Sequence, residues 1–169
     1  MLITLEALED GPLPFDEVFA ASKIDFAVAG LRQTAPLHVQ GTASAIEREI
    51  HIRGGLTTQV EMECARCLDP VVRAVKSDFD LFYQPLDESP EGNELVVPKG
   101  EEELGFYSGE GLVLEDVAKE QVLLSLPMRT VCREDCKGLC PTCGINRNRE
   151  TCQCKPTGGD PRWAALQNL

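Results

Sequence analysis

The spacing of the eight cysteines constrains this chain more than any other feature of its sequence. Five of them fall within the nineteen residues of CKGLCPTCGINRNRETCQC, from Cys136 to Cys154. Five thiols do not divide into whole four-ligand metal sites. The other three lie outside this stretch, at Cys64, Cys67 and Cys132, and complete a set of eight. We therefore expect a fold in which a segment near residue 64 meets the tail of the chain.

Two C-x-x-C steps, CARC and CPTC, indicate what the thiols do. In a metal knuckle this spacing turns two sulfurs toward one ion, while the following backbone N–H groups point back at the thiolates. Gly144, directly after CPTC, suits such a turn because glycine tolerates positive φ. We predict structural zinc, with one or two ions, as the cofactor. The candidate ligands are Cys64, Cys67, Cys132, Cys136, Cys140, Cys143, Cys152 and Cys154.

The sequence leaves the partition of these ligands open. One partition joins the two C-x-x-C steps into a single site of Cys64, Cys67, Cys140 and Cys143, and leaves CREDC and CQC to supply the second. Another assigns one ion to Cys132, Cys136, Cys140 and Cys143, and a second to the other four. Iron, a redox dithiol in either C-x-x-C step, and disulfides or unlinked thiols are the competing interpretations. The redox interpretation lacks a βαβ context around either step.

The beginning of the chain and its hydropathy predict an intracellular protein. MLITLEALEDGPLPFDE is acidic and lacks the positive leader and apolar run of a secretory signal. No apolar stretch approaches the ~20 residues that a membrane helix needs. We expect a cytoplasmic location, where thiols stay reduced and clustered cysteines are more often metal ligands than disulfides.

Charge is distributed unevenly along the 169 residues. The net charge is −12, yet residues 127–169 carry a balance of +3, which leaves −15 for the rest. One interpretation is that acidic loops keep the body in solution. The other is that the basic tail faces a polyanion such as RNA.

Alternating apolar and polar residues predict antiparallel strands in the middle of the chain. IEREIHIR at 46–53 and LTTQVEMEC at 56–64 both alternate with period two. We predict a hairpin with a three-residue loop at 53–55, because that register places Ile52 opposite Leu56 on the apolar face. Further extended segments are predicted at 71–83, at 36–45, and around Ile3 and Phe26. An acidic loop with one short strand at 95–97 is predicted at 84–103.

LEDVAKEQVLLSLP predicts the main helix, at about residues 114–126, and ends at Pro127. Its apolar face consists of Leu114, Val117, Ala118 and Val122. Asp160 as N-cap and Pro161 predict a short terminal helix, on which Trp163 is a docking residue.

Together these patterns predict an α+β fold: an antiparallel β-sheet or partial barrel with one main packing helix and a cysteine-rich zinc-knuckle tail. Residues 1–128 form the acidic, β-rich body with its helix. Residues 129–169 form the basic tail with its short terminal helix, packed on the body as one unit.

Catalytic motifs are scarce. His38 and His51 are the only histidines, and neither has the H-x-E or H-E-x-x-H spacing of a catalytic zinc site. The sequence also has no G-x-S-x-G motif and no P-loop. We predict that both histidines are solvated and that the chain is not an enzyme.

Five motifs resemble a known family. ECARCLDPV at 63–71, LSLP ending at Pro127, CREDCKGLCPTCG at 132–144, CQC at 152–154 and the final DPRWAALQNL occur in the order found in YceD-type proteins. These are bacterial large ribosomal RNA accumulation proteins with relatives in chloroplasts. The resemblance covers about residues 35–169.

The resemblance implies a non-enzymatic factor that supports accumulation of 23S ribosomal RNA, and so biogenesis of the large subunit. The implied partners are ribosomal RNA precursors or large-subunit assembly intermediates, contacted directly or through a ribosomal protein. No membrane and no small-molecule substrate is implied. Two alternatives are kept: a thiol-disulfide redox protein that uses a C-x-x-C pair, and a zinc-ribbon adaptor that binds protein without RNA.

The cationic residues of the tail are the predicted contacts to RNA phosphates or to a ribosomal protein. These candidates are Arg129, Arg133, Lys137, Arg147, Arg149 and Lys155. The alternative is that they are scattered charges that only increase solubility.

Overall fold

The structure, a computed structural model, describes residues 1–86 and 104–154. The chain divides into two compact units. The first comprises residues 1–62 and 72–128, and the second comprises residues 63–71 together with the chain from 129 onward. A short loop in the middle of the sequence therefore belongs to the same unit as the cysteine-rich tail.

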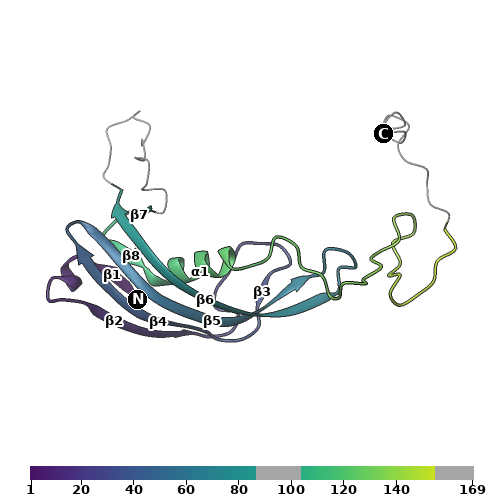
Figure 1. The fold of residues 1–169 in the computed structure, drawn as a ribbon, viewed down its shortest axis with the longest axis horizontal. Coiled ribbons are helices and arrows are strands. Elements are labelled where there is room, and N and C mark those ends of the chain that lie inside the picture. The colour runs from purple at the N-terminus through teal and green to yellow at the C-terminus, as the bar shows by residue number, and fades with distance from the viewer. Residues whose placement is uncertain (87–103, 155–169) are drawn as a thin grey trace, which may run out of the picture. The chain divides into compact units, whose positions relative to one another are not determined.

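A six-stranded sheet forms most of the first unit (Figure 1). Its strands are β2 (Leu13–Phe19), β3 (Arg32–Gln33), β4 (Leu37–Ile46), β5 (Glu49–Glu63), β6 (Pro70–Pro85) and β7 (Leu104–Tyr107). They lie in the order β2, β4, β5, β6, β7, and β3 pairs with the end of β5 at Val60 and Glu61. The other described elements are β1 (Leu2–Thr4), which pairs with β8 (Gly111–Val113), a 3-10 turn (Glu6–Leu8) and the helix α1 (Leu114–Leu124).

The sheet is mixed. The β2–β4 and β4–β5 pairs are antiparallel, but β6 and β7 are parallel, with Phe82 opposite Leu104. A parallel pair needs a long connection, and the chain between β6 and β7 is long enough to supply it. The predicted α+β class with a main packing helix is confirmed, and the β6–β7 pair is the parallel exception to the predicted antiparallel sheet.

The predicted hairpin at residues 53–55 is wrong. Gly54 and Gly55 lie inside β5, and the turn is at Glu47 and Arg48, where β4 ends and β5 begins. Glu47 adopts a φ of +56° there. Period-two alternation continues through the two glycines, so a single strand satisfies the same apolar pattern as the predicted hairpin.

Two glycines meet across β4 and β5, and aromatic rings occupy the space above them. Gly41 is opposite Gly54. A Cβ added to Gly41 would lie 2.6 Å from the ring of Phe15, and one added to Gly54 would lie 3.1 Å from the ring of Phe79. Glycine in a strand often marks such a close approach, and a neighbouring ring compensates for the missing side chain.

The helix α1 packs on the sheet of the first unit (Figure 1). Its predicted apolar face is confirmed, because all four of its residues are buried. The helix ends at Leu124, two residues before the predicted end. Its first residue is tied to the start of the chain, since the backbone N–H of Leu114 donates to the carbonyl of Met1 at 3.1 Å. No helix in residues 1–86 and 104–154 is long and apolar enough to cross a membrane.

The remaining predictions have different outcomes. The strands predicted at 71–83 and 36–45 are confirmed as β6 and β4, and the extended piece around Ile3 is confirmed as β1. Phe26 is buried but lies outside any strand, and β2 was not predicted. The short strand at 95–97 and the terminal helix with Trp163 lie outside the described residues, as does most of the acidic loop.

Replacing Gly54 with alanine should destabilise the first unit by roughly 1–3 kcal/mol, as overpacking of a close contact does. The added Cβ would lie 2.3 Å from the carbonyl oxygen of Gln40, a backbone atom that cannot swing aside. Gly55→Ala is the matched control, because its nearest contact, at 2.7 Å, is the flexible carboxylate of Asp78. Urea unfolding measures both, and equal loss of stability in the two variants would contradict the assignment of this contact.

Candidate metal centre

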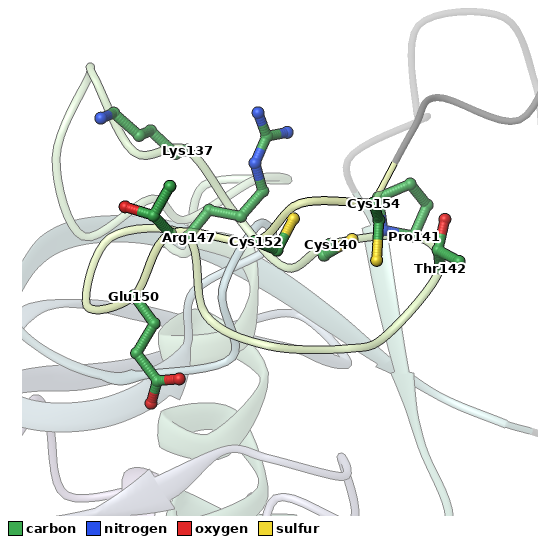
Figure 2. Close-up of a pocket in the computed structure, with 9 residues that line it drawn as sticks. Lys137, Cys140, Pro141, Thr142, Arg147, Glu150, Cys152 and Cys154 are labelled. Atoms are coloured by element: carbon green, nitrogen blue, oxygen red, sulfur yellow. The ribbon is translucent and has the colours of Figure 1, made fainter.

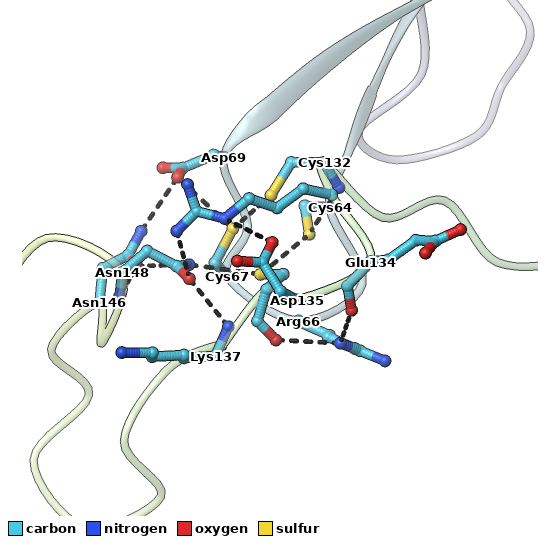
Figure 3. Close-up of polar contacts among 12 residues, drawn as sticks. Cys64, Arg66, Cys67, Asp69, Cys132, Glu134, Asp135, Lys137, Asn146 and Asn148 are labelled. Carbon is cyan, nitrogen blue, oxygen red and sulfur yellow. Dashed lines mark hydrogen bonds and ion pairs between the residues drawn. The ribbon is translucent and has the colours of Figure 1, made fainter.

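The eight cysteines gather into two groups of four, both in the second unit. The first tetrad is Cys64, Cys67, Cys132 and Cys136, and the second tetrad is Cys140, Cys143, Cys152 and Cys154. Within each tetrad the four sulfur atoms lie within 4.8 Å of one another. Figure 2 shows Cys140, Cys152 and Cys154 of the second tetrad, and Figure 3 shows Cys64, Cys67 and Cys132 of the first.

The observed grouping differs from both predicted partitions. Each of those shared one ion between Cys140 and cysteines of the first tetrad, whereas the structure groups Cys140 and Cys143 with Cys152 and Cys154. The reason lies in the backbone route. The N–H of Leu139 donates to the carbonyl of Arg66 at 2.9 Å. This bond holds residues 132–136 against the first knuckle, residues 64–67. The chain then turns away and forms a second knuckle.

Both C-x-x-C steps have the predicted knuckle geometry. The N–H of Leu68 donates to the carbonyl of Cys64, and that of Gly144 donates to the carbonyl of Cys140, both at 2.9 Å. Gly144 has a φ of +74°, as expected. Its counterpart Leu68 has a φ of +60°, a conformation that is uncommon for a residue with a side chain.

Backbone N–H groups stabilise the thiolate of the first cysteine in each knuckle. Burial raises the pKa of Cys64, but the N–H groups of Arg66, Cys132 and Cys67 outweigh burial and lower the pKa to about 6. The N–H groups of Cys143 and Thr142 lower the pKa of Cys140 to about 6, against a smaller effect of burial. Thiolates are the form that binds metal.

The spacing of the sulfur atoms fits a tetrahedral metal site. Four sulfurs at ~2.3 Å from a central ion lie about 3.8 Å apart. The Cys64 and Cys136 sulfurs are 3.9 Å apart, and those of Cys67 and Cys132 are 3.7 Å apart. A disulfide would require ~2.05 Å, and all eight cysteines are free. The four thiols of the first tetrad can therefore hold one ion, and a tetrathiolate set suits zinc or iron.

Asn148 connects the first tetrad to the tail (Figure 3). Its amide nitrogen donates to the sulfur of Cys136 at 3.3 Å, while its oxygen accepts from the backbone N–H of Lys137 at 2.8 Å and from Arg133 at 2.9 Å. Burial raises the pKa of Cys136, but the amide of Asn148 and the N–H of Gly138 lower it overall. Such outer contacts orient ligands and favour the thiolate.

Arg66 clamps the first knuckle to the segment that carries Cys132 and Cys136. Its guanidinium donates to the carbonyls of Glu134 and Cys136, at 2.8 and 3.0 Å. Gly138 fits against the backbone of Arg66, because an added Cβ would lie 2.8 Å from the Arg66 carbonyl. Gly138 also has a φ of +71°, so glycine is required there for two reasons.

Asp69 joins the knuckle to the residues after the second C-x-x-C. Its carboxylate accepts from Arg149 at 2.8 Å and from Asn146 at 3.0 Å, and it lies 3.4 Å from the sulfur of Cys67. Sequence reasoning missed four residues that support the site: Arg66, Asp69, Asn146 and Asn148. The alternation of asparagine and arginine in NRNR, residues 146–149, is a sequence signal for Asn146 and Asn148, but it carries no information on Arg66 or Asp69.

The second tetrad is more exposed than the first. In the first tetrad only Cys132 is exposed, whereas in the second only Cys140 is buried and Cys143 and Cys154 are exposed. A small hairpin positions the second tetrad, with Leu139 bridged to Asn146.

The structure assigns different surroundings to the six cationic candidates. Arg133 donates to the side chain of Asn148 and forms an ion pair with Asp135 at 3.2 Å. Arg149 forms an ion pair with Asp69. Lys137 and Arg147 line a cavity beside the second tetrad, and Arg129 is exposed. Lys155 lies outside the described residues.

Both histidines belong to the first unit and pair with carboxylates. The Nε2 atom of His38 lies 2.6 Å from Oδ1 of Asp16, and the Nε2 atom of His51 lies 2.5 Å from Oδ1 of Asp80. His51 also stacks on the ring of Phe82, with centroids 4.4 Å apart, and is therefore less solvated than predicted.

Comparison with known proteins assigns the family. Residues 52–169 match the family described as large ribosomal RNA subunit accumulation protein YceD. The chain belongs to the YceD family. The matched region begins within β5 and includes all eight cysteines, so the resemblance drawn from the motifs is confirmed.

Relatives of this YceD-family chain occur in mycobacteria and plants. It is 32% identical to an uncharacterized protein of Mycobacterium tuberculosis, over 91% of this chain and 72% of the relative. It is 24% identical to the YCED homolog 1, chloroplastic, of Zea mays, over 75% of this chain and 51% of the relative. The Arabidopsis thaliana homolog 1 is also 24% identical, over 98% and 60%. No solved structure matches the chain.

Asn148→Ala should lower the metal affinity of the first tetrad about 10- to 100-fold, because the variant loses the amide that orients Cys136. Competition with a chromophoric chelator measures the affinity. Gln153→Ala, at an exposed position between two ligands of the second tetrad, is the control. An unchanged affinity in Asn148→Ala would show that the amide contact is not part of the metal centre.

A chelator should withdraw metal in two phases, the faster from the exposed second tetrad and the slower from the buried first tetrad. Cys154→Ser should remove the fast phase and retain the slow one, and Cys67→Ser should do the reverse. Stopped-flow detection of the released metal follows both phases. A single phase in the wild-type chain would contradict the difference in accessibility.

Proposed function

We propose that this YceD-family chain is a non-enzymatic factor for ribosome biogenesis, acting in the cytoplasm to support accumulation or processing of 23S ribosomal RNA. The observation that carries the proposal is the family match, which extends over the whole cysteine-bearing unit. The family's description and the names of the two plant relatives refer to accumulation of the large ribosomal RNA subunit.

Structural zinc, one ion in each tetrad, is the proposed cofactor. Each tetrad supplies four thiols, which complete a tetrahedral zinc site and leave no position open for a substrate or water. Closed sites of this kind stabilise folds and do not perform chemistry. Zinc in the first tetrad would hold the loop of residues 63–71 to the tail.

Two observations support a non-enzymatic role. Both histidines lie in the first unit and all eight cysteines in the second, so none of the thiols shares its unit with a histidine base. Each C-x-x-C pair also shares its tetrad with two further thiols, an arrangement that favours metal binding over disulfide exchange. The two alternatives to this proposal are a thiol-disulfide redox protein and a zinc-ribbon adaptor that binds protein without RNA.

The proposed partners are ribosomal RNA precursors or large-subunit assembly intermediates, contacted directly or through a ribosomal protein. We place this contact on the second unit, where Arg129, Lys137 and Arg147 are exposed. The predicted division into a body of residues 1–128 and a tail of 129–169 is retained as part of the proposal. It is modified because the loop of residues 63–71 belongs with the tail.

Depletion of the protein should lower the ratio of 23S to 16S ribosomal RNA, and expression of the wild-type chain should restore it. Affinity purification of the tagged chain should enrich large-subunit precursors over a tagged control protein of similar acidity. Gel quantification and sequencing of the bound RNA measure the two effects. An unchanged ratio together with no enrichment of ribosomal RNA or ribosomal protein would refute the proposed function.

A further inference from the structure

A cavity of about 250 Å³ lies beside the second tetrad. Three of the four cysteines of that tetrad line it, together with two cationic side chains, Lys137 and Arg147. The hydroxyl groups of Thr142 and Thr151 also line the cavity. A lysine, an arginine and hydroxyl donors are the groups that proteins use to contact phosphate.

The backbone fixes the positions of the two cations. The N–H of Arg147 donates to the carbonyl of Gly138 at 2.9 Å, across the hairpin bridged at Leu139 and Asn146. The N–H of Lys137 is held by the side chain of Asn148 at 2.8 Å. The backbone of both residues is therefore held by hydrogen bonds before any ligand binds, so the chain loses less conformational entropy on binding.

The two side chains extend to one side of the cavity. Figure 2 shows the ammonium group of Lys137 and the guanidinium group of Arg147 on the same side, and the carboxylate of Glu150 on the opposite side. Within the described residues neither cationic side chain forms an ion pair, in contrast to Arg133 and Arg149. The pair is thus available to an external anion.

The charge of a metal-bound tetrad determines how an anion can approach. Zinc with four thiolates carries a net charge of −2, which opposes a phosphate that enters close to the sulfurs. A phosphate at the ends of the long side chains meets the cationic groups first, in solvent that screens the more distant thiolates. A phosphate of a nucleic-acid backbone can contact the ends of Lys137 and Arg147 while it stays away from the thiolates. A small anion buried in the cavity would lie close to them.

We propose that the rim formed by Lys137 and Arg147 contacts the phosphodiester backbone of RNA, and that this contact forms only when the second tetrad holds its metal ion. The proposal rests on the function proposed above and identifies the residues through which the RNA is bound. Cys140, Cys152 and Cys154 form the wall of the cavity, so metal binding fixes the surface that presents the two cations. By linkage, bound RNA must in turn stabilise the metal in this tetrad.

The test uses the full-length, zinc-loaded chain and an in vitro transcript of a 23S ribosomal RNA segment, with affinity measured over a range of salt concentrations. Lys137→Gln/Arg147→Gln should weaken binding roughly 10- to 100-fold and reduce the slope of log affinity against log salt by about 2, one for each phosphate contact. Arg32→Gln/Arg53→Gln removes two exposed cations of the first unit and is the matched control. It should leave both quantities unchanged.

Metal release supplies the second readout. The RNA should slow withdrawal of zinc from the second tetrad by a chelator in the wild-type chain, and this protection should be absent in Lys137→Gln/Arg147→Gln. Cys154→Ser should bind RNA as weakly as the double variant while retaining one zinc. Inorganic phosphate at constant ionic strength is the comparison probe and should give no protection.

The outcomes separate this proposal from the proposed function. The tagged chain could enrich large-subunit precursors while both double variants bind the transcript with the same affinity and salt slope. That result would show that the rim is not the RNA contact, and the proposed role in biogenesis would stand. Unchanged RNA binding in Cys154→Ser would overturn the dependence on metal. Equal protection by inorganic phosphate would show a site for the free anion and overturn the backbone contact.

Discussion

The second unit depends on the approach of four thiols, two from the β5–β6 loop and two from a segment that begins sixty-five residues after Cys67, at Cys132. Four sulfurs within 4.8 Å repel one another when ionised, and a divalent cation removes that repulsion. The buried apolar cluster here is small, since it consists of cysteines flanked by Val71 and Val131. Since the described residues of this unit supply so little apolar core, we infer that metal in each tetrad stabilises the part of the unit around it, and that metal binding and folding there are linked.

The first unit has a different source of stability. Its sheet and helix share a continuous hydrophobic cluster that includes Ile50, Val60 and Val122. Removal of metal should therefore unfold the cysteine-bearing unit and leave the sheet intact. Each unit would thus be stabilised by its own interactions. The proposed RNA contact lies on the unit that we expect metal to stabilise.

Local features of the site could be predicted from the sequence, but its assembly could not. The C-x-x-C spacing and Gly144 correctly indicated two knuckles, because their geometry depends only on neighbouring residues. The grouping of the cysteines depends on long-range contacts, such as Leu139 to Arg66 and Arg149 to Asp69, for which spacing carries no signal. In the sheet, Gly54 was interpreted as part of a turn because the rings that compensate for it come from distant strands. The helix was predicted well because its apolar period is local.

The metal content of the anaerobically purified full-length chain tests the central claim most directly. Native mass spectrometry gives the number of ions per chain, and elemental analysis identifies them. We predict two zinc ions per chain, one for each tetrad, with all eight cysteines protected from alkylation until a chelator is added. A metal-free chain whose second unit resists proteolysis, with thiols that react freely or form disulfides, would contradict the account.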